Sequence, residues 1–403
     1  MGKYKSFHIK GAVLDRFGLQ QYMEKIASDH MLQNKSERKT YPIPTLNENF
    51  KMITKVYYLL KEHVKLGIYI HPAGEWLLDN YYIIEETVKK TSRELSYTKY
   101  KKFLKLVNGP YQGYARIYVL AAEIVAYTGS KIEEENLKLV LQSYQNKKQL
   151  NMEEIWSIGL FLQIALVQNI RQVCEKIYFA QMQKYKVENM IERLVENKAE
   201  KKFKGKSIWD TPVNMRKTPL QFKQPSTGEL RYPFIEYMSY RLKRMGRIAI
   251  PYLEVLEEQV EKTGTTISEV IRKEHFDIAL SKVEIGEAVK SMKNLLKTNF
   301  YSIFEDINGV EKILKQDPSE VYSNMDYRTK DIYRNKIKEL SKKTRISEIY
   351  IANKILELSR QYKKIYDAEN KEDLEKYKKT HIGYFILNDQ NELLQSLQRK
   401  FHN

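Results

Sequence analysis

The spacing of apolar residues restricts the fold of this chain more than any other feature. Phe50, Ile53, Val56, Tyr57 and Leu60 recur at intervals of three and four, which places them on one face of an α-helix. Similar spacing continues through most of the 403 residues, and only 16 glycines and 10 prolines interrupt it. Long runs that alternate apolar and polar side chains, as in a half-buried strand, are absent. The sequence therefore predicts an all-α fold.

Prolines divide the helical pattern into two lobes. Pro212, Pro219, Pro225 and Pro233 fall close together, and each removes a backbone donor and clashes with the preceding helical turn. We therefore expect a linker or crossing loop there. The expected parts are an irregular amino-terminal arm (1–45), a helical domain (46–200), the proline-rich linker (201–233), a second helical domain (234–375) and a carboxy-terminal tail (376–403).

The lobes are expected to be bundles or stacked helical pairs, because helices joined by short polar connections pack as antiparallel neighbours. One segment departs from the helical pattern. "HIGYFILND" (381–389) is rich in β-branched and aromatic residues. It predicts at most one short strand near the carboxy terminus, or a tail that packs against another element.

Polar side chains ahead of the periodic segments predict where several helices begin. A Ser or Thr followed three residues later by Glu forms a capping box, and Asn, Asp and Ser are also favoured N-caps. The predicted boxes are Ser130 with Glu133 and Thr266 with Glu269, and the predicted single caps are Asn151, Asp326 and Ser347.

Cysteine content and hydropathy predict a cytoplasmic protein. The single Cys174 cannot form an internal disulfide, which fits a reducing compartment. The first residues contain no apolar core of a signal peptide. The longest apolar run (155–170) is short for a membrane span and carries Gln163, Gln168 and Asn169, so we expect it to be a buried core helix.

The formal net charge of +18 is compatible with three kinds of surface. It could bind nucleic acid, lie on an anionic membrane, or simply be well solvated. Lysines are scattered, with the densest cluster at 201–206, and no recognised nucleic-acid-binding motif is present. We expect no nucleic-acid partner, and a basic nucleic-acid-binding helical protein stays as an alternative.

Motifs of catalysis are absent, apart from one candidate pair of acids. The chain has no phosphate-binding glycine loop, no GxSxG, CxxC, HExxH or DxD motif, and its histidines are dispersed, so we expect no metal and no cofactor. Glu75 and Asp79 lie one helical turn apart, a spacing that suits the two carboxylates of a retaining glycosidase. Acids early in a helix also interact favourably with its dipole. A glucan-acting hydrolase or transglycosylase is therefore an alternative, while a structural role for both acids is the main expectation.

Four further residues are candidates for binding a glycan. Trp76, Tyr111 and Tyr114 could stack on sugar rings, and Arg116 could bond hydroxyl or phosphate groups. The alternative is that Tyr111, Tyr114 and Tyr118 form a helical stripe in the core.

Two of these stretches carry a resemblance to a known family. "AGEWLLDNYYIIEE" and "NGPYQGYARIYVLAAEIVAY" resemble segments of the amino-terminal cytosolic region of cyclic β-1,2-glucan synthases. The resemblance continues in order through "LNMEEIWSIGLFLQIALVQNIRQ", "GTTISEVIRKEH", "INGVEKILKQDPSEVYSNMDYRTKDIYRNKIKELSKKT" and "HIGYFILND". It covers about residues 45–390, and the proline-rich segment is its weakest part.

The resemblance implies that the chain belongs to a glucan-synthesising system, and it does not imply a catalytic site within the chain. Members of this family are large inner-membrane proteins that extend a β-1,2-glucan from UDP-glucose, close the ring and trim chain length with a phosphorylase-like module. Their donor-binding and catalytic motifs have no counterpart here, so no catalytic residue can be transferred. We expect an accessory or scaffold domain at the inner face of the cytoplasmic membrane. Its expected partners are the catalytic and membrane modules of the same synthase, and β-1,2-glucan is a candidate ligand.

Overall fold

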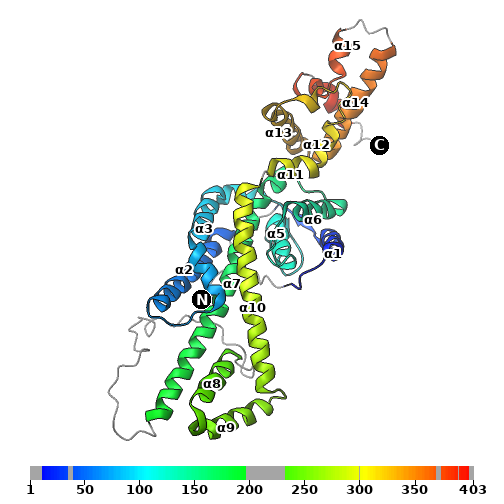
Figure 1. The fold of residues 1–403 in the computed structure, drawn as a ribbon. Coiled ribbons are helices and arrows are strands. Elements are labelled where there is room, and N and C mark those ends of the chain that lie inside the picture. The colour runs from blue at the N-terminus through cyan, green and yellow to red at the C-terminus, as the bar shows by residue number, and fades with distance from the viewer. Residues whose placement is uncertain are drawn as a thin grey trace.

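The structure is a computed structural model that describes residues 11–34, 40–196, 232–298, 300–368, 374–388 and 390–398. The molecule is elongated and almost entirely helical (Figure 1). Within the described ranges, the one sheet pairs two short antiparallel strands, β1 (Leu32–Gln33) and β2 (Lys105–Leu106). The predicted all-α fold is confirmed.

The helices fall into an amino-terminal and a carboxy-terminal series. The first series is α1 (Arg16–Asp29), α2 (Pro42–Lys65), α3 (Pro72–Glu94), α4 (Tyr97–Lys101), α5 (Arg116–Tyr127), α6 (Glu134–Lys147) and α7 (Met152–Glu196). The second is α8 (Tyr232–Arg244), η3 (Gly246–Ala249), α9 (Ile250–Glu261), α10 (Ile267–Lys297), α11 (Phe300–Ile307), α12 (Gly309–Leu314), η4 (Tyr322–Asn324), α13 (Tyr327–Thr344), α14 (Glu348–Ala368), α15 (Leu374–Lys379), the π-helix η5 (Tyr384–Asn388) and α16 (Gln390–Gln398).

The first hydrophobic core surrounds α5 and the first half of α7. Both helices are apolar on almost every side, and a helix of that kind is stable in water only when neighbours cover all of it. Helices α2, α3 and α10 pack against α7, and α5 packs against it as well. Ile158, Phe161 and Leu166 are fully buried, so the predicted core helix at 155–170 is confirmed. Among the described residues, no helix is long and apolar enough to span a membrane.

Helix α10 runs beside α7 over much of the length of the molecule (Figure 1). Its carboxy-terminal part adds Ile285, Val289 and Met292 to the first core. Its amino-terminal part meets α8 and α9 at the foot of the molecule, where small apolar clusters join α7, α8 and α9. Within the predicted linker, only Tyr232 and Pro233 are described, and they begin α8; the rest of that prediction lies outside the described residues.

The second core is formed by α12, η4, α13, α14, η5 and α16. Leu314, Ile337, Ile355 and Phe385 are completely buried in it. Helix α11 connects the two cores, because its Ile307 belongs to the first core and α12 begins two residues later. The segment 381–389, for which a strand was one alternative, is helical where it is described and packs into the second core.

Most of the predicted caps are confirmed. Asp326 accepts hydrogen bonds from two backbone N–H groups of α13, Ser347 accepts one from α14, and Thr266 forms a capping box with Glu269. Asn151 forms a further capping box with Glu154 at the start of α7. The prediction for Ser130 is wrong.

Ser130 lies before the helix that it was expected to cap. Helix α6 begins at Glu134, with Glu133 in the N-cap position and no side-chain cap. Ser130 is buried with a φ of 66°. Its hydroxyl accepts a hydrogen bond from Asn169, and its carbonyl accepts one from Ser291. Contacts with α7 and α10 therefore determine its conformation, and these contacts cannot be seen in the local sequence.

Candidate functional site

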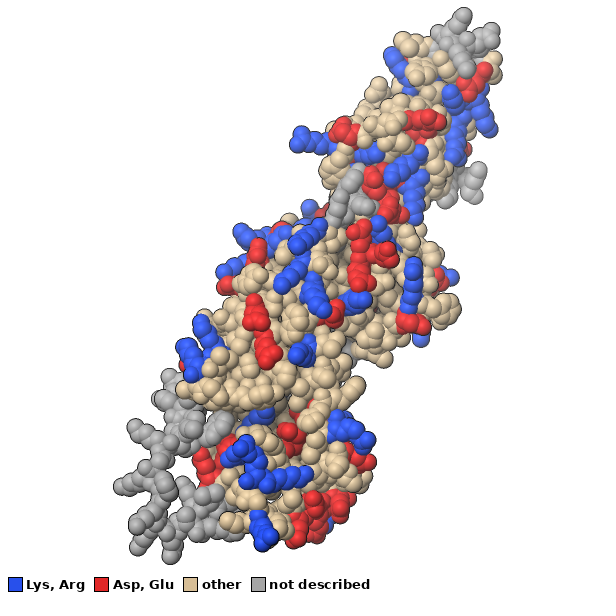
Figure 2. Space-filling view, viewed as in Figure 1, with Lys and Arg blue, Asp and Glu red and all other residues tan. Residues whose placement is uncertain are grey.

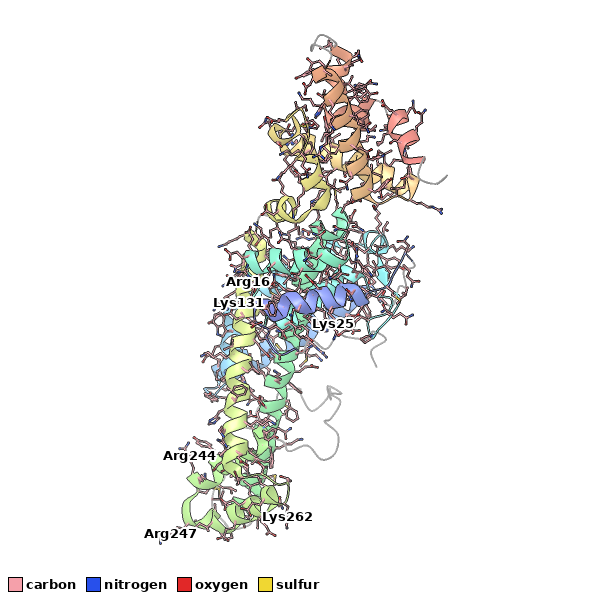
Figure 3. The ribbon with its side chains drawn as sticks, turned by 90° about the vertical axis from the view of Figure 1, so that its right-hand side faces the viewer. Arg16, Lys25, Lys131, Arg244, Arg247 and Lys262 are labelled. Atoms are coloured by element: carbon pink, nitrogen blue, oxygen red, sulfur yellow. The ribbon has the colours of Figure 1, made fainter. Side chains whose placement is uncertain are left out.

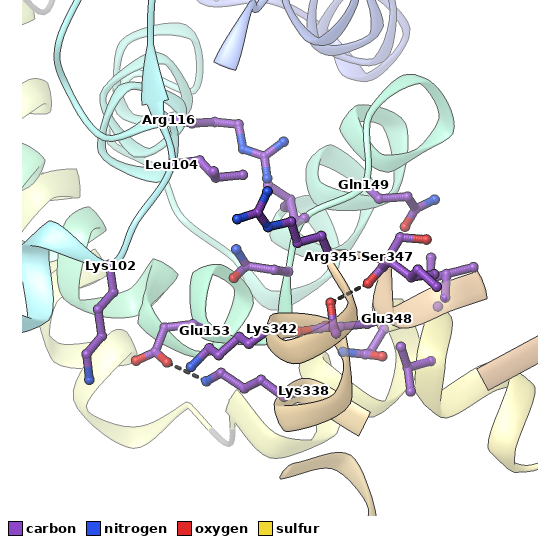
Figure 4. A pocket seen from close by; sticks show the side chains of 18 of the residues that line it. Lys102, Leu104, Arg116, Gln149, Glu153, Lys338, Lys342, Arg345, Ser347 and Glu348 are labelled. Carbon is purple, nitrogen blue, oxygen red and sulfur yellow. Dashed lines mark hydrogen bonds and ion pairs between the residues drawn. The ribbon is translucent and has the colours of Figure 1, made fainter. Parts of the chain in front are cut away.

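A polar cleft of about 1020 Å³ lies where the first core meets the second (Figure 4). We call it the junction cleft. One wall comes from Lys102 and Leu104 and from the connection between α6 and α7, and Arg116 lies at the floor. The other wall comes from Lys338 on α13 and from the connection between α13 and α14. Its volume is typical of sites for small molecules.

The floor of the junction cleft contains a buried ion pair. Arg116 is 1% exposed, and its Nε atom donates to Oε1 of Glu154 at 3.0 Å while Nη2 donates to Oε2. Glu154 is fully buried, and its Oε2 atom also accepts the backbone N–H of Asn151. One carboxylate therefore caps α7 and neutralises the arginine. The remaining nitrogen of the guanidinium group, Nη1, makes no hydrogen bond of acceptable geometry among the described residues, although the hydroxyl of Tyr144 lies near the group.

A second buried cation lies near the same carboxylate. Lys105 is fully buried, and its ammonium group donates to the carbonyls of Tyr100 and Phe103 at 2.7 and 2.6 Å. Burial lowers the pKa of Lys105 to about 8, and attraction to Glu154 opposes this shift. Burial and the positive charge of Arg116 lower the pKa of the nearby His30 to about 4. Beneath the cleft, burial therefore disfavours the charged forms of Lys105 and His30.

The rim of the junction cleft carries more cations than acids. Lys102, Lys342 and Arg345 are exposed, and no ion pair joins them to a carboxylate within the described part of the chain. Of the two acids in the lining, Glu153 pairs with Lys338 across the junction between the cores. Burial raises the pKa of the other, Glu348 on α14, and the nearby backbone N–H of Met152 and the cations Lys338 and Lys342 oppose this shift.

Arg345 has an unusual backbone conformation for its residue type. It ends α13 with φ 61° and ψ 21°, in the left-handed region that glycine usually occupies at this position. For a residue with a Cβ atom this conformation costs about 1–2 kcal/mol. In Figure 4 its guanidinium group points toward the same space as that of Arg116.

Glu75 and Asp79 lie on an exposed face of α3. Leu77, Ile84 and Val88 on the opposite face are buried, as the helical spacing predicted. Neither acid is among the residues that line the junction cleft. A catalytic role for Glu75 and Asp79 stays untested.

The four glycan-binding candidates lie in separate places. Trp76 is half-buried against Gly286 of α10, with the ammonium of Lys290 5.8 Å from its ring. Tyr111 is partly buried against the first core, and Tyr114 is buried within it. Arg116 alone lines the junction cleft. The structure therefore does not assemble these residues into one sugar-stacking surface.

Sequence reasoning did not identify most residues of the junction cleft. The spacing of Asn151 and Glu154 matches a capping box and was available from the sequence. Arg345 gave no signal, because any helix can end in a basic residue. Lys102 and Lys338 come from segments far apart in the chain, and only the packing of the two cores brings them together.

A separate charged cluster lies at the foot, between α7, α8 and α10. The Nζ atom of Lys184 lies 4.9 Å from the ring centroid of Tyr69 and 5.4 Å from that of Tyr237. Burial raises the pKa of Glu274 to about 7, and repulsion by Glu236 adds to the shift. Burial also lowers the pKa of Lys184. These groups lie where the helices pack, so we interpret them as part of that packing.

On the face shown in Figure 2, basic and acidic side chains are interspersed, and no extended region carries charge of a single sign. Figure 3 places Arg244, Arg247 and Lys262 at the foot, whereas Arg16, Lys25 and Lys131 lie near the middle of the molecule. The basic residues shown there are therefore spread along the molecule.

The fold and the cleft define an elongated all-α protein with a cation-rich cleft between two helical cores. No protein-family model matches the chain. It is similar to the cyclic β-(1,2)-glucan synthase NdvB of Rhizobium meliloti (strain 1021), with 22% identity over 312 residues. The match covers 77% of this chain and 10% of that protein, so the chain spans about a tenth of the length of its relative. The predicted relationship to the cyclic β-1,2-glucan synthases is thereby confirmed.

Proposed function

We propose that this chain is a non-catalytic helical module of a β-1,2-glucan-synthesising system. It supports the glucosyltransferase by holding other modules of the system in place at the inner face of the cytoplasmic membrane. The observation that carries this proposal is the similarity to a cyclic β-(1,2)-glucan synthase over 77% of the chain. The synthase is much longer, and the proposal assigns to this chain only a supporting part of its activity.

The extent of the similarity favours a shared domain over a shared helix. A match over 312 of 403 residues must include α5 and α10 and most of α7, wherever it begins. Those helices form the centre of the first core, and they carry Arg116 and Glu154. A chance resemblance between amphipathic helices would not extend through so many elements in order.

Loss of the gene tests the proposal in the cells that carry it. Membranes from cells with a disrupted gene should incorporate less glucose from labelled UDP-glucose into β-1,2-glucan, and the wild-type gene should restore incorporation. The purified chain alone should transfer no glucose. Unchanged glucan synthesis after disruption would overturn the proposal, and transfer by the purified chain would overturn its non-catalytic part.

A matched variant separates support from catalysis. A gene with both Glu75→Gln and Asp79→Asn should restore glucan synthesis as well as the wild type, because both acids lie on an exposed helix face. If the variant chain is folded and stable but restores nothing, the acids take part in the reaction and the hydrolase or transglycosylase alternative gains support.

A further inference from the structure

The charges of the junction cleft do not balance. Its lining contains five cationic side chains, Lys102, Arg116, Lys338, Lys342 and Arg345, and two acidic ones, Glu153 and Glu348. Glu154, which lies behind the lining, neutralises Arg116, so four cations remain against two acids. A glucan is uncharged, so binding a glucan would not require an excess of cationic side chains. An anion would neutralise this excess positive charge, and partial burial would strengthen the attraction.

We propose that the junction cleft binds a small anion that carries phosphate groups, with Arg116 at its floor and Lys342 and Arg345 at its rim. This inference goes beyond the proposed function, because it assigns a ligand that is not a glucan. It also stands on separate observations, namely the cavity and the side chains that line it.

The floor provides the first argument. Arg116 is 1% exposed, and its Nη1 atom makes no hydrogen bond of acceptable geometry among the described residues, although a buried donor without an acceptor costs about 1–3 kcal/mol. Because Arg116 lines the cleft, an anion in the cleft would supply an acceptor to Nη1, in addition to the hydroxyl of Tyr144 near the guanidinium group. Glu154 neutralises Arg116, and Lys105 is a second buried cation near the same carboxylate.

The rim provides the second argument. Lys102, Lys342 and Arg345 extend from two different walls, and no carboxylate lies within ion-pair distance of them in the described part of the chain. Glu153 is already paired with Lys338, and it attracts Lys102 only from a greater distance, as Glu348 attracts Lys342. The three cations of the rim therefore remain available for direct contact with a ligand.

The backbone of Arg345 provides the third argument. Its left-handed conformation would suit glycine better, so the arginine side chain destabilises the local backbone. Strained residues persist where their side chain has another role. Here the side chain points into the junction cleft, toward the same space as that of Arg116 (Figure 4).

The size of the cleft indicates how large the ligand is. A volume of about 1020 Å³ greatly exceeds what one phosphate ion fills and is at the upper end of the range for small-molecule sites. The cations also come from both walls, so they can contact more than one anionic group. A diphosphate, free or attached to a nucleoside, fits these features better than a single phosphate.

Titration of the purified full chain with pyrophosphate tests the proposal. Calorimetry at low salt should show saturable binding to the wild type, with weaker binding of inorganic phosphate. ADP in place of pyrophosphate tells a nucleotide from a free diphosphate. Arg345→Gly and Lys342→Ala should each weaken binding about 10-fold or more, because each removes a charge-assisted contact. Arg247→Ala, which removes one exposed cation at the foot, should bind like the wild type (Figure 3).

The Arg345→Gly variant also shows whether weaker binding results from a loss of folding. Glycine relieves the left-handed conformation, so the Tm of this variant should equal or exceed that of the wild type. The proposal is overturned if pyrophosphate does not bind saturably, or if Arg345→Gly and Lys342→Ala leave binding unchanged. Equal weakening by Arg247→Ala would also overturn it, since that result indicates general charge attraction. None of these outcomes bears on glucan synthesis, so this inference and the proposed function can fail separately.

Discussion

Among the described residues, each of the two cores contains one buried arginine–glutamate pair, and the two pairs differ in what surrounds them. In the first core, Arg116 bonds Glu154 through two nitrogen atoms and borders the junction cleft. In the second core, Arg334 donates to Glu311 at 2.9 Å, and the hydroxyl of Tyr322 donates to the same carboxylate oxygen at 2.7 Å.

Aromatic side chains enclose the second pair. The ring of Tyr327 lies 5.5 Å from the guanidinium carbon of Arg334, and Tyr322 is fully buried beside Glu311. Arg334 is not among the residues that line the junction cleft, whereas Arg116 is. Under the anion-binding proposal, one buried ion pair serves packing alone and the other forms one side of a binding site. The space next to the pair makes the difference.

The largest expected effect comes from removing one member of each pair. Glu154→Gln and Glu311→Gln each leave a buried arginine without its counter-ion, so each should lower the free energy of unfolding by about 3–5 kcal/mol. Urea titrations of both variants measure the loss. Pyrophosphate should restore stability to the two variants to different extents, because it can reach Arg116 through the cleft. It should raise the Tm of Glu154→Gln more than that of Glu311→Gln. Equal responses would contradict the contrast drawn between the two pairs.

Lowering the pH should destabilise the first core more than the second, by somewhat less than the loss of a buried ion pair does. Burial lowers the pKa of His30, His63 and His71 to about 4, and neighbouring cations add to the shift at His30 and His71. The unfolded chain, with histidine near 6.5, binds these protons first. Their contribution to stability is therefore complete above about pH 6.5 and is lost as the pH falls toward 4. For the almost fully buried His63 the loss is about 3 kcal/mol at pH 4.

The second core should be insensitive over the same interval. Asp317 is buried, which by itself raises its pKa, but hydrogen bonds from His381 and Ser319 outweigh burial and lower it. Its contribution is present above its ordinary pKa of 3.8 and is lost only below that pH. Glu274 at the foot acts in the opposite direction, because its raised pKa favours folding as the pH falls from about 7.

Hydrogen exchange followed by mass spectrometry checks this difference region by region. Between pH 7 and pH 4.5, after correction for intrinsic exchange, peptides from α5 and the first half of α7 should lose protection. Peptides from α13 and α14 should keep theirs. Peptides from the amino-terminal half of α10 are compared separately, because Glu274 lies there and should have the opposite effect on stability. Equal loss in both cores would show that the buried histidines do not control acid stability.

Capping residues should have smaller effects that are similar in the two cores. Asp326→Ala at the start of α13 and Asn151→Ala at the start of α7 each remove a side-chain acceptor from the first helical turn. Each should cost about 0.5–2 kcal/mol in a urea titration. Asn151 also lines the junction cleft, so its variant should be the only one of the two that changes pyrophosphate binding. A loss of glucan synthesis without a loss of stability would show that Asp326 has a function beyond capping.

Features set by neighbouring residues could be predicted from the sequence, and features set by tertiary contacts could not. Thr266 and Asp326 cap helices because their partners lie two or three residues away. Ser130 looked the same in sequence, but Asn169 and Ser291 hold it in another conformation. Arg116 was selected for its charge, but its partner Glu154 lies 38 residues away and could not be identified.

The smallest expected effect concerns Glu75 and Asp79 on α3. Cleavage of a glycosidic bond needs a carboxylic acid with a raised pKa and a second carboxylate that face each other in a cleft from which water is excluded. These two acids are exposed on the side of α3 opposite Leu77, and they lie away from the junction cleft. They therefore lack the enclosed surroundings, shielded from water, that this reaction needs.

Glu75→Gln and Asp79→Asn should therefore change the free energy of unfolding by no more than about 0.5 kcal/mol, as is usual for surface positions. Incubation of the purified wild-type chain with linear β-1,2-glucan should yield no shorter products, and both variants should behave identically. Arg345→Gly is the matched comparison, because it changes the cleft and leaves α3 intact. Product formation by the wild type that either acid substitution abolishes, while Arg345→Gly leaves it intact, would place the chemistry on α3. In that case the exposed acids of the first core would be catalytic, and the module would be an enzyme in its own right.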